Sequence, residues 1–272
     1  MPDTDSLNAY TPVEIARRVE AAGESKARMA LLPLAMLSVL AGAFIGLGAM
    51  LFVMVRSDAS LGFATSAFFG GLVFSLGLLM VVVAGAELFT GNNLLVLAWA
   101  DGHIRSTQLL RNWVVVCLGN FVGAAGLALL VYWSGHTQLN GGAVGQKVVQ
   151  IALAKQALPI WTAFVRGVLC NILVCMAVWM AMGGRSVVDK LVAVVFPITA
   201  FVAAGFEHSI ANMYLMPLAM LLQASGASAD AQAVTWAGML GNLLPVILGN
   251  LSGGAGMVGL VYYVIYLRQP SR

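Results

Sequence analysis

The sequence predicts an all-α integral membrane protein with six transmembrane helices, built as an inverted 3+3 repeat in which the second and fifth helices are broken. Composition is the first reason, because 60% of the 272 residues are hydrophobic and only 9% are charged, whereas roughly a quarter of the residues of soluble domains are charged. Length is the second reason, since one crossing needs about 20 apolar residues. The segments without Asp, Glu, Lys or Arg support six crossings: 29–55, 59–86, 113–146, 167–184, 191–206 and 231–267.

An internal repeat is the third reason. The sequence GAELFTGN at 85–92 returns as GFEHSIAN at 205–212, and residues 118–132 match residues 248–262 in the same order. The two offsets are 120 and 130 residues, so the chain divides into two related halves. Three crossings in each half place the second half upside down relative to the first.

The chain ends flank this transmembrane domain. We expect a cytoplasmic N-terminal segment at 1–30, a six-helix domain at 31–267 with repeat halves at about 31–135 and 160–267, and a cytoplasmic tail at 268–272. The N-terminal segment is polar and of mixed charge, which is typical of an amphipathic lead-in and not of a cleavable signal peptide. The first transmembrane helix fits 33–55, which is rich in Gly and Ala, as expected where helix backbones approach closely in lipid.

The second crossing has an unusual length. Between Asp58 and Asp101 lie 42 residues with one charge, too many for one helix, while the part after Asn93 is too short for a second. A broken span resolves this, with a long arm to Glu87, a loop at 88–93 and a short arm to Ala100. Backbone leaves the helix at membrane depth only where it lines a cavity or is buried in protein.

The remaining crossings follow in order. The third is predicted at 108–134, and a polar loop containing Lys147 and Lys155 leads to the fourth at 161–182. The fifth repeats the broken design, with arms at 191–204 and up to about 222 and a break at 205–212. The sixth is predicted at 236–267. With this topology ten basic residues lie on the side of the termini and four on the other, so the positive-inside bias places both termini in the cytoplasm.

Ionisable groups inside these apolar spans are the candidate functional residues, because a charge at membrane depth is costly and marks a pathway or site by default. His208 is the first candidate, since an imidazole exchanges a proton near neutrality; the alternative is a histidine that is simply hydrogen-bonded in the bundle. Thr90 lies in the equivalent loop of the first repeat, where its hydroxyl can donate to a passing anion or to His208. Glu87 and Glu207, with Asn92 and Asn212, are expected to brace the loops, the carboxylates accepting hydrogen bonds from freed backbone N–H groups.

Several other polar residues have two interpretations. Lys155, with Lys147 nearby, either attracts anions or is a solvated loop lysine. Asn120, Asn171 and Asn250 either donate into a pore or join helices. Arg166 is expected to extend toward the membrane surface or to pair with an acid.

No cofactor, metal or nucleic acid is expected. The histidines at 103, 136 and 208 are not at ligand spacing and lack nearby Cys or carboxylate clusters in the sequence. The buried-looking Cys117, Cys170 and Cys175 are interpreted as packing residues. No phosphate-binding loop is present in the sequence, so gradients must drive any transport.

At these residues the chain resembles the formate/nitrite transporter family. The resemblance rests on ELFTGNN at 87–93, on CNILVCMAVW at 170–179 and on FVAAGFEHSIANM at 201–213. Within the family, GRSVVDK at 184–190 and GLVYYVIYLR at 259–268 are most similar to the formate channels. ELFTG is also similar to the nitrite channels.

The resemblance implies an aquaporin-like protomer, a homopentamer with one pore per protomer, and a bacterial inner-membrane location. It assigns His208 as the central histidine, Thr90 as the loop threonine, and Lys155 with Asn171 as the periplasmic lysine and its partner. It places Glu207 and Asn250 in the same polar network. The implied hydrophobic constrictions are formed by Phe74, Phe201, Leu78, Leu88 and Val174.

The expected function is pH-dependent passive or proton-coupled transport of small monovalent anions, with formate crossing as the anion or the neutral acid. Nitrite or hydrosulfide are the alternatives within the family. An intramembrane enzyme that uses Glu207 and His208 as acid and base is the alternative from another class. A neutral-solute channel of the aquaporin type predicts two Asn-Pro-Ala loops, and the sequence contains none.

Overall fold

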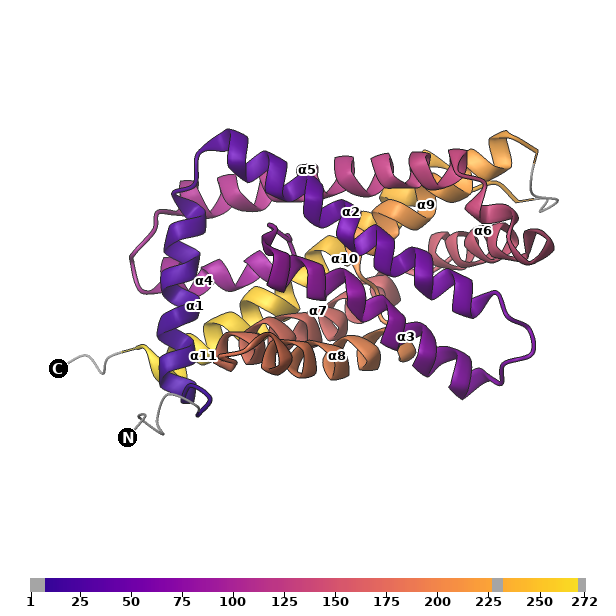
Figure 1. Cartoon of the computed structure of the whole chain (residues 1–272). Coiled ribbons are helices and arrows are strands. Elements are labelled where there is room, and N and C mark those ends of the chain that lie inside the picture. The colour runs from indigo at the N-terminus through magenta and orange to yellow at the C-terminus, as the bar shows by residue number, and fades with distance from the viewer. Residues whose placement is uncertain (1–7, 227–231, 269–272) are drawn as a thin grey trace.

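The computed structural model describes residues 8–226 and 232–268, and within these ranges every regular element is a helix. The expected tail at 269–272, the first seven residues and residues 227–231 lie outside the described ranges. Figure 1 shows the long helices running roughly along one direction, with α1 across one end of the bundle and α6 at the other. Both described chain ends, α1 and α11, lie at the same end.

Helix α1 (Pro12–Ala27) is an amphipathic helix outside the spanning bundle. It begins at a capping box in which Thr11 and Glu14 satisfy each other's backbone N–H groups, and such a box fixes where a helix starts. Its buried residues are Ala16, Val19, Gly23 and Ala27. These small residues let α1 pack closely over the end of the bundle.

Five helical stretches are long and apolar enough to cross a membrane by length and composition. They are α2 (Leu31–Arg56), α3 with its π turn η2 (Phe63–Gly85), α5 (Ser106–Trp133), α7 (Ile160–Gly183) and the continuous stretch of α10, η6 and α11 (Trp236–Tyr266). The remaining crossing combines two shorter helices, α8 (Val187–Ala203) and α9 (Ser209–Ala224). The all-helical fold with broken second and fifth spans is therefore confirmed.

The two breaks occur at equivalent places. The first arm ends at Gly85 and the chain resumes as the 3-10 helix η3 (Gly91–Leu95) and the short α4 (Val96–Ala100). The second arm ends before Gly205. Gly85 has φ +88° and Gly205 has φ +70°, the left-handed region that glycine adopts without strain. The first break begins two residues earlier than predicted, so Glu87 lies in non-helical backbone and not at a helix end.

The segment predicted as a polar loop between the third and fourth crossings contains a helix, α6 (Ala143–Gln156), so that prediction was wrong. Its buried residues, Val144, Val148, Val149 and Ala152, recur at helical spacing. Two short 3-10 turns, η4 (His136–Gln138) and η5 (Asn140–Gly142), precede it. Lys155 therefore lies in the last turn of a packed helix, which fixes its position at the end of the bundle opposite α1.

The two halves use the same close helix contacts. Gly42 of α2 lies against the backbone of Asn120 in α5, and Gly249 of α10 lies against the backbone of Phe164 in α7. A side chain at either glycine would collide with a backbone carbonyl. Such contacts bring the polar residues of α5 and α10 next to the two breaks, as expected of small residues at helix interfaces in lipid.

Candidate functional site

The two broken spans meet at Thr90 and His208. Thr90 Oγ1 lies 3.0 Å from Nε2 of His208, and both side chains are buried. His208 is also the N-cap of α9, where its Nδ1 accepts a hydrogen bond from the backbone N–H of Ala211 at 3.2 Å. The structure thus brings together two residues that the sequence placed in equivalent loops.

These contacts define the state of the ring. Because Nδ1 accepts a backbone N–H, the proton of a neutral imidazole must be on Nε2, and Nε2 then donates to Thr90 Oγ1. A doubly protonated ring would have a proton facing the Ala211 N–H. The arrangement therefore fits the neutral ring, and it leaves the hydroxyl proton of Thr90 available to a molecule in the pore. Within the described residues the Thr90 hydroxyl makes no other hydrogen bond.

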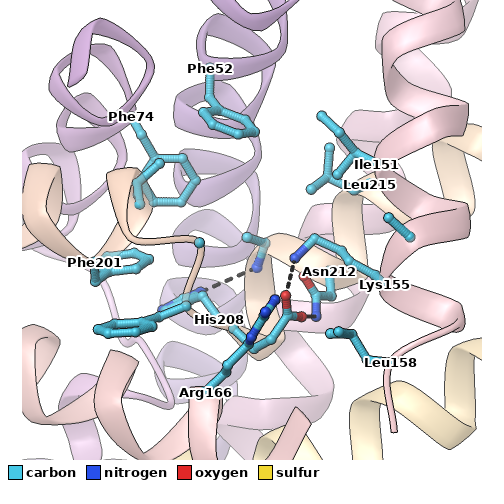
Figure 2. Close-up of a pocket in the computed structure, with 16 residues that line it drawn as sticks. Phe52, Phe74, Ile151, Lys155, Leu158, Arg166, Phe201, His208, Asn212 and Leu215 are labelled. Atoms are coloured by element: carbon cyan, nitrogen blue, oxygen red, sulfur yellow. Dashed lines mark hydrogen bonds and ion pairs between the residues drawn. The ribbon is translucent and has the colours of Figure 1, made fainter. Parts of the chain in front are cut away.

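Aromatic rings cover one side of this pair. The ring of Phe201 stacks on His208 with centroids 5.8 Å apart and planes at 24°. Phe74 meets Phe201 edge-on at 5.7 Å. The imidazole therefore has an apolar wall on this side, as Figure 2 shows.

A cavity of about 260 Å³, called here the distal vestibule, lies on the aromatic side of the pair, at the end of the bundle opposite the termini. Its polar lining comprises Lys155, Arg166, Glu207, His208 and Asn212. Phe52, Phe74 and Phe201 contribute apolar surface to it. Figure 2 shows these side chains converging on one space.

A second cavity of about 500 Å³, called here the proximal vestibule, lies beneath α1 at the end that holds both termini. Its lining includes Lys26, Glu87, Asn92, Leu78 and Leu88. Within the described chain the two vestibules have no lining residue in common. A barrier that contains the Thr90–His208 pair therefore separates them.

The predicted constrictions divide between the two sides. Phe74 and Phe201 line the distal vestibule, and Leu78 and Leu88 line the proximal one. Val174 is 1% exposed and lines neither of these cavities, so its position does not match a constriction that faces either of them. It instead belongs to the packed core.

The distal vestibule contains a cycle of four polar side chains. Nζ of Lys155 lies 2.8 Å from Oε1 of Glu207, and Asn212 donates to the other carboxylate oxygen at 2.7 Å. The same amide nitrogen of Asn212 donates to Oδ1 of Asn242 at 2.7 Å. Asn242 closes the cycle by donating to the backbone carbonyl of Lys155 at 3.0 Å.

The proximal vestibule contains the same cycle. Nζ of Lys26 lies 3.0 Å from Oε1 of Glu87, and Asn92 donates to Oε2 of Glu87 at 2.6 Å. Asn92 also donates to Asn112 at 3.0 Å, and Asn112 donates to the carbonyl of Lys26 at 3.3 Å. The inverted repeat therefore extends from the backbone to individual hydrogen bonds.

Sequence reasoning missed Lys26, Asn112 and Asn242. The offset of 130 residues between the third and sixth helices also relates Asn112 to Asn242, and this match could have been found by extending the comparison upstream. Lys26 could not be found in this way, because it lies in an amphipathic segment before the first crossing. Its place in the vestibule depends on how α1 packs.

Two asparagines hold the backbone of the breaks. Asn120 donates to the carbonyl of Glu87 at 2.9 Å and accepts from the N–H of Phe89 at 2.9 Å. Asn250 donates to the carbonyl of Glu207 at 3.1 Å and accepts from the N–H of Ser209 at 3.1 Å. Both are fully buried and line neither vestibule. Of their two interpretations, the geometry therefore favours joining helices over donating into the pore.

The structure corrects the expected partner of Lys155. Asn171 does not contact this lysine; it donates to the carbonyls of Thr90 and Asn250 at 3.2 and 2.7 Å and to Oδ1 of Asn93 at 2.7 Å. Asn171 lies in the middle of α7, whereas Lys155 lies in the last turn of α6 and is paired with Glu207. Asn171 therefore stabilises the Thr90 loop.

Two further expectations were wrong. The carboxylates of Glu87 and Glu207 accept from lysine and asparagine side chains and not from backbone N–H groups. Their own backbone N–H groups donate to the carbonyls of Leu37 and Arg166 instead. The Arg166 side chain lines the distal vestibule, and no described carboxylate lies within ion-pair distance of it.

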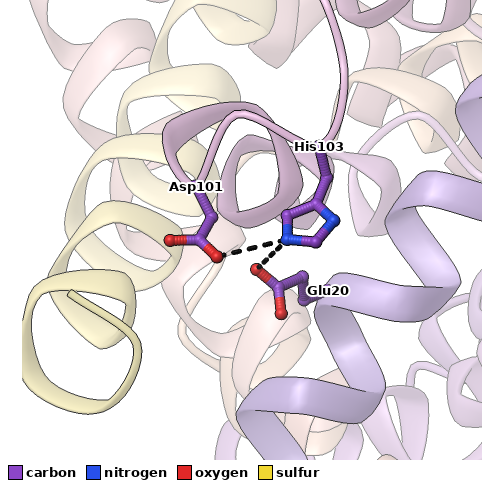
Figure 3. Close-up of side chains that lie close together, drawn as sticks. All are labelled: Glu20, Asp101 and His103. Carbon is purple, nitrogen blue, oxygen red and sulfur yellow. Dashed lines mark ion pairs between the residues drawn. The ribbon is translucent and has the colours of Figure 1, made fainter. Parts of the chain in front are cut away.

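One cluster lies outside the pore. His103, in the turn after α4, has its Nε2 3.3 Å from Asp101 and 3.9 Å from Glu20 of α1, as Figure 3 shows. The expectation that no carboxylates surround a histidine was therefore wrong, because Glu20 is remote in sequence. The three ligand atoms lie within 4.8 Å of one another, which is close enough to hold a metal ion. Burial, and then the neighbouring Asp101, raise the pKa of Glu20 to about 7.

The comparisons with known proteins agree with this geometry. The model of the formate/nitrite transporter family matches residues 13–264. The chain is 38% identical to the formate channel FocA of Escherichia coli strain K12, with 99% of both chains covered. It is 39% identical to the formate channel FocA of Haemophilus influenzae, with 93% of both covered.

Solved structures agree as well. A pentameric formate channel with formate bound has a TM-score of 0.81 at 35% identity, covering 88% of this chain and 98% of that chain. An FNT family ion channel has a TM-score of 0.83 at 33% identity, covering 93% of this chain and 98% of that chain.

Proposed function

The chain belongs to the formate/nitrite transporter family, and on this basis we propose that it transports formate, and other small weak-acid anions, across the bacterial inner membrane. The observation that carries the proposal is the separation of two vestibules by a barrier whose polar centre is the Thr90–His208 pair. Both termini are cytoplasmic in this proposal, so the proximal vestibule faces the cytoplasm and the distal vestibule faces the periplasm.

The vestibules collect the anion. Each contains an ammonium group, Lys155 on the periplasmic side and Lys26 on the cytoplasmic side. A cation in a narrow cleft with apolar walls raises the local concentration of anions. The buried glutamate beside each lysine fixes the position of the ammonium group, so the substrate meets it at a defined depth.

The barrier excludes the charged form. Moving a carboxylate out of water costs several kcal/mol unless it is paired, and the Phe74, Phe201, Leu78 and Leu88 side chains offer no partner. A carboxylate that takes up a proton in the vestibule loses most of this cost. Formate therefore crosses the barrier as formic acid and ionises again on the far side.

The pair at the centre offers a hydrogen bond and not a proton. A neutral His208 that gave up its Nε2 proton would become an imidazolate, which the apolar wall disfavours. The proton therefore comes from water in the vestibule, and Thr90, held by His208, donates its hydroxyl proton to the neutral acid as it passes. This narrows the role expected for His208 from proton donor to the group that orients Thr90.

Assembly follows the same reasoning. The structure of a pentameric formate channel superposes on this chain with a TM-score of 0.81. On α5, the exposed residues Leu110, Val114, Leu118 and Val122 form a stripe at helical spacing. We assign such apolar surface to contacts with lipid and with neighbouring protomers in a homopentamer.

The intramembrane-enzyme alternative has less support. An acid–base pair needs the two groups within hydrogen-bond reach of a common substrate atom. Glu207 uses its carboxylate oxygens for Lys155 and Asn212, while His208 uses its ring nitrogens for Thr90 and Ala211. Neither residue has a free group for general acid or base chemistry.

A substrate panel tests the proposal. Purified protein in liposomes is offered formate, nitrite, acetate and hydrosulfide at an acidic and at a neutral external pH, with protein-free liposomes as the control. We expect formate uptake above the control, faster at acidic external pH. Uptake of nitrite but not formate would transfer the assignment to nitrite, and uptake of none of the four would overturn the proposal.

A further inference from the structure

Arg166 is the position at which the two matched vestibules differ in charge. Arg166 follows Lys155 by 11 residues, and Leu37 follows Lys26 by 11 residues. The backbone carbonyl of Arg166 accepts the N–H of Glu207 at 3.3 Å, and that of Leu37 accepts the N–H of Glu87 at 3.2 Å. Each residue lines the vestibule of its own half. The repeat thus places a guanidinium on one side where the other side has a leucine.

The charges within the vestibules show why this matters. In each vestibule the lysine is paired with a glutamate, at 2.8 Å distally and 3.0 Å proximally. Such a pair has no net charge. The proximal lining contains no other charged residue among those described, whereas the distal lining also contains Arg166. Arg166 therefore supplies the net positive charge of the distal vestibule.

The side chain is also placed to reach a substrate. Figure 2 shows Arg166 directed into the vestibule between His208 and Leu158, toward Lys155. Arg166 is exposed, and its guanidinium has no hydrogen bond or ion pair to any described residue. A guanidinium presents parallel N–H donors that match the two oxygens of a planar carboxylate, which an ammonium group does not.

We propose that Arg166 binds the substrate carboxylate in the distal vestibule and makes the affinity for substrate higher from the distal face than from the proximal face. The proposal rests on the proposed function, because it concerns the same substrate on the same path. It assigns the two cations different tasks. Lys155 is held by Glu207 and shapes the site, while Arg166 recognises the planar anion.

A passive pathway limits what such a site can do. At low substrate concentration, detailed balance requires that the permeability be equal in both directions, whatever Arg166 binds. The asymmetry therefore appears only in the half-saturating concentration measured separately from each face. This restriction makes the proposal testable against a general loss of activity, which would change both directions and both faces.

The test compares the wild type with Arg166→Leu, which gives the distal half the residue of the proximal half. Formate influx is measured at low salt in membrane vesicles of both orientations. We expect the half-saturating concentration from the distal face to rise about threefold, as expected for one unit charge roughly 6 Å from the substrate in water. From the proximal face it should not change, and the distal effect should shrink at high salt because exposed charges are screened.

Three further variants separate charge, shape and folding. Arg166→Lys keeps the charge but not the fork, so it should retain hydrosulfide affinity and lose part of the affinity for formate. Arg166→Gln serves if the leucine variant does not assemble, and it should resemble the expected leucine result. Lys147→Leu is the matched control, because Lys147 is in α6 at the same end of the bundle but does not line the vestibule.

The outcomes are distinct. An unchanged distal half-saturating concentration in Arg166→Leu and Arg166→Gln overturns the proposal, as does an equal change from both faces. A change of the same size in Lys147→Leu would replace it with a general surface-charge effect. If the wild-type protein transports no formate, the proposed function itself is wrong, and that result is visible before any variant is compared.

Discussion

The hydroxyl of Thr90 and Nε2 of His208 lie 3.0 Å apart, and this one contact joins two spans that are separated by 118 positions in the sequence. The histidine caps α9 with its other ring nitrogen. The end of a helix, an imidazole and a hydroxyl therefore form one chain of hydrogen bonds between the backbone and the pore. We expect this chain to set both the stability of the breaks and the passage of the substrate.

Replacing Thr90 with valine tests this chain, because valine keeps the shape and removes the hydroxyl. The buried Nε2–H of His208 then has no acceptor, which costs about 1–3 kcal/mol. The neutral acid also loses a donor at the barrier, and a hydrogen bond of about 1.4 kcal/mol corresponds to roughly tenfold in rate. Formate flux in liposomes should fall by that order. Thr90→Ser retains the hydroxyl, so flux as low in serine as in valine would rule out the hydroxyl as the cause.

The two lysine–glutamate pairs predict an ordered loss of stability. Lys155→Met and Lys26→Met each leave a buried carboxylate without its cation, and such a loss typically costs about 3–5 kcal/mol when the pair is fully buried. The Lys155 side chain is 15% exposed and that of Lys26 is 31% exposed. Water therefore compensates more at Lys26, and the melting temperature of the purified protein should fall further in Lys155→Met. The reverse order would contradict this account of the pairs.

Gly205 predicts a cost that comes from the backbone alone. Its φ is +70°, and a methyl group there would meet no atom within 4 Å. Gly205→Ala should therefore destabilise the protein by about 1–2 kcal/mol through strain and not through a clash. Gly126 in α5 also has open space but a helical backbone, so Gly126→Ala is the control and should be neutral or stabilising. Equal melting temperatures for the two variants would show that the left-handed turn is not strained.

Glu20 predicts a pH dependence of the contact between α1 and the bundle. Its carboxyl has a pKa raised from 4.5 to about 7 by burial and by Asp101, so the packed state binds its proton more tightly than the free state. The contribution of Glu20 to packing is therefore fully present below about 4.5 and is lost as the pH rises to about 7. Hydrogen exchange in α1, corrected for the intrinsic effect of pH, should be faster above this window than below it.

Glu20→Gln removes the titrating group and keeps its size. The pH dependence of exchange in α1 should then largely disappear, although His103 and Glu24 still titrate nearby. An exchange rate that depends on pH to the same extent in the glutamine variant would assign the effect to those residues.

The breaks were predictable because they combine two local signals. A glutamate inside an apolar segment is costly, and Glu87 and Glu207 recur at the same place in the repeat. The two glycines that end the arms, Gly85 and Gly205, are part of the same pattern. Local chemistry alone therefore placed the site at mid-membrane.

The partners within the site were not predictable in the same way. Lys26 reaches Glu87 only because α1 packs across the end of the bundle, and that packing depends on tertiary contacts. Asn171 was assigned to Lys155 by resemblance, yet its amide is spent on the carbonyl groups of the Thr90 loop. Hydrogen bonds between segments remote in sequence leave no periodic signal along the chain.

Helix α6 illustrates a different limit. Its first half contains Gly145, Gln146 and Lys147 and is preceded by Asn140, Gly141 and Gly142, a composition typical of loops. Its apolar residues nevertheless recur at helical spacing. Periodicity was the better signal here, because burial against α9 decides the conformation.

The account depends most on the claim that the substrate crosses the barrier between the vestibules without its charge. The direct measurement is the number of protons that move with each formate into liposomes, read from an internal pH dye and a radiolabelled substrate, with the membrane potential recorded at the same time. The account predicts one proton for each formate, with no potential generated by uptake. Formate uptake that builds a potential and leaves the internal pH unchanged would show that the anion itself crosses, and would contradict it.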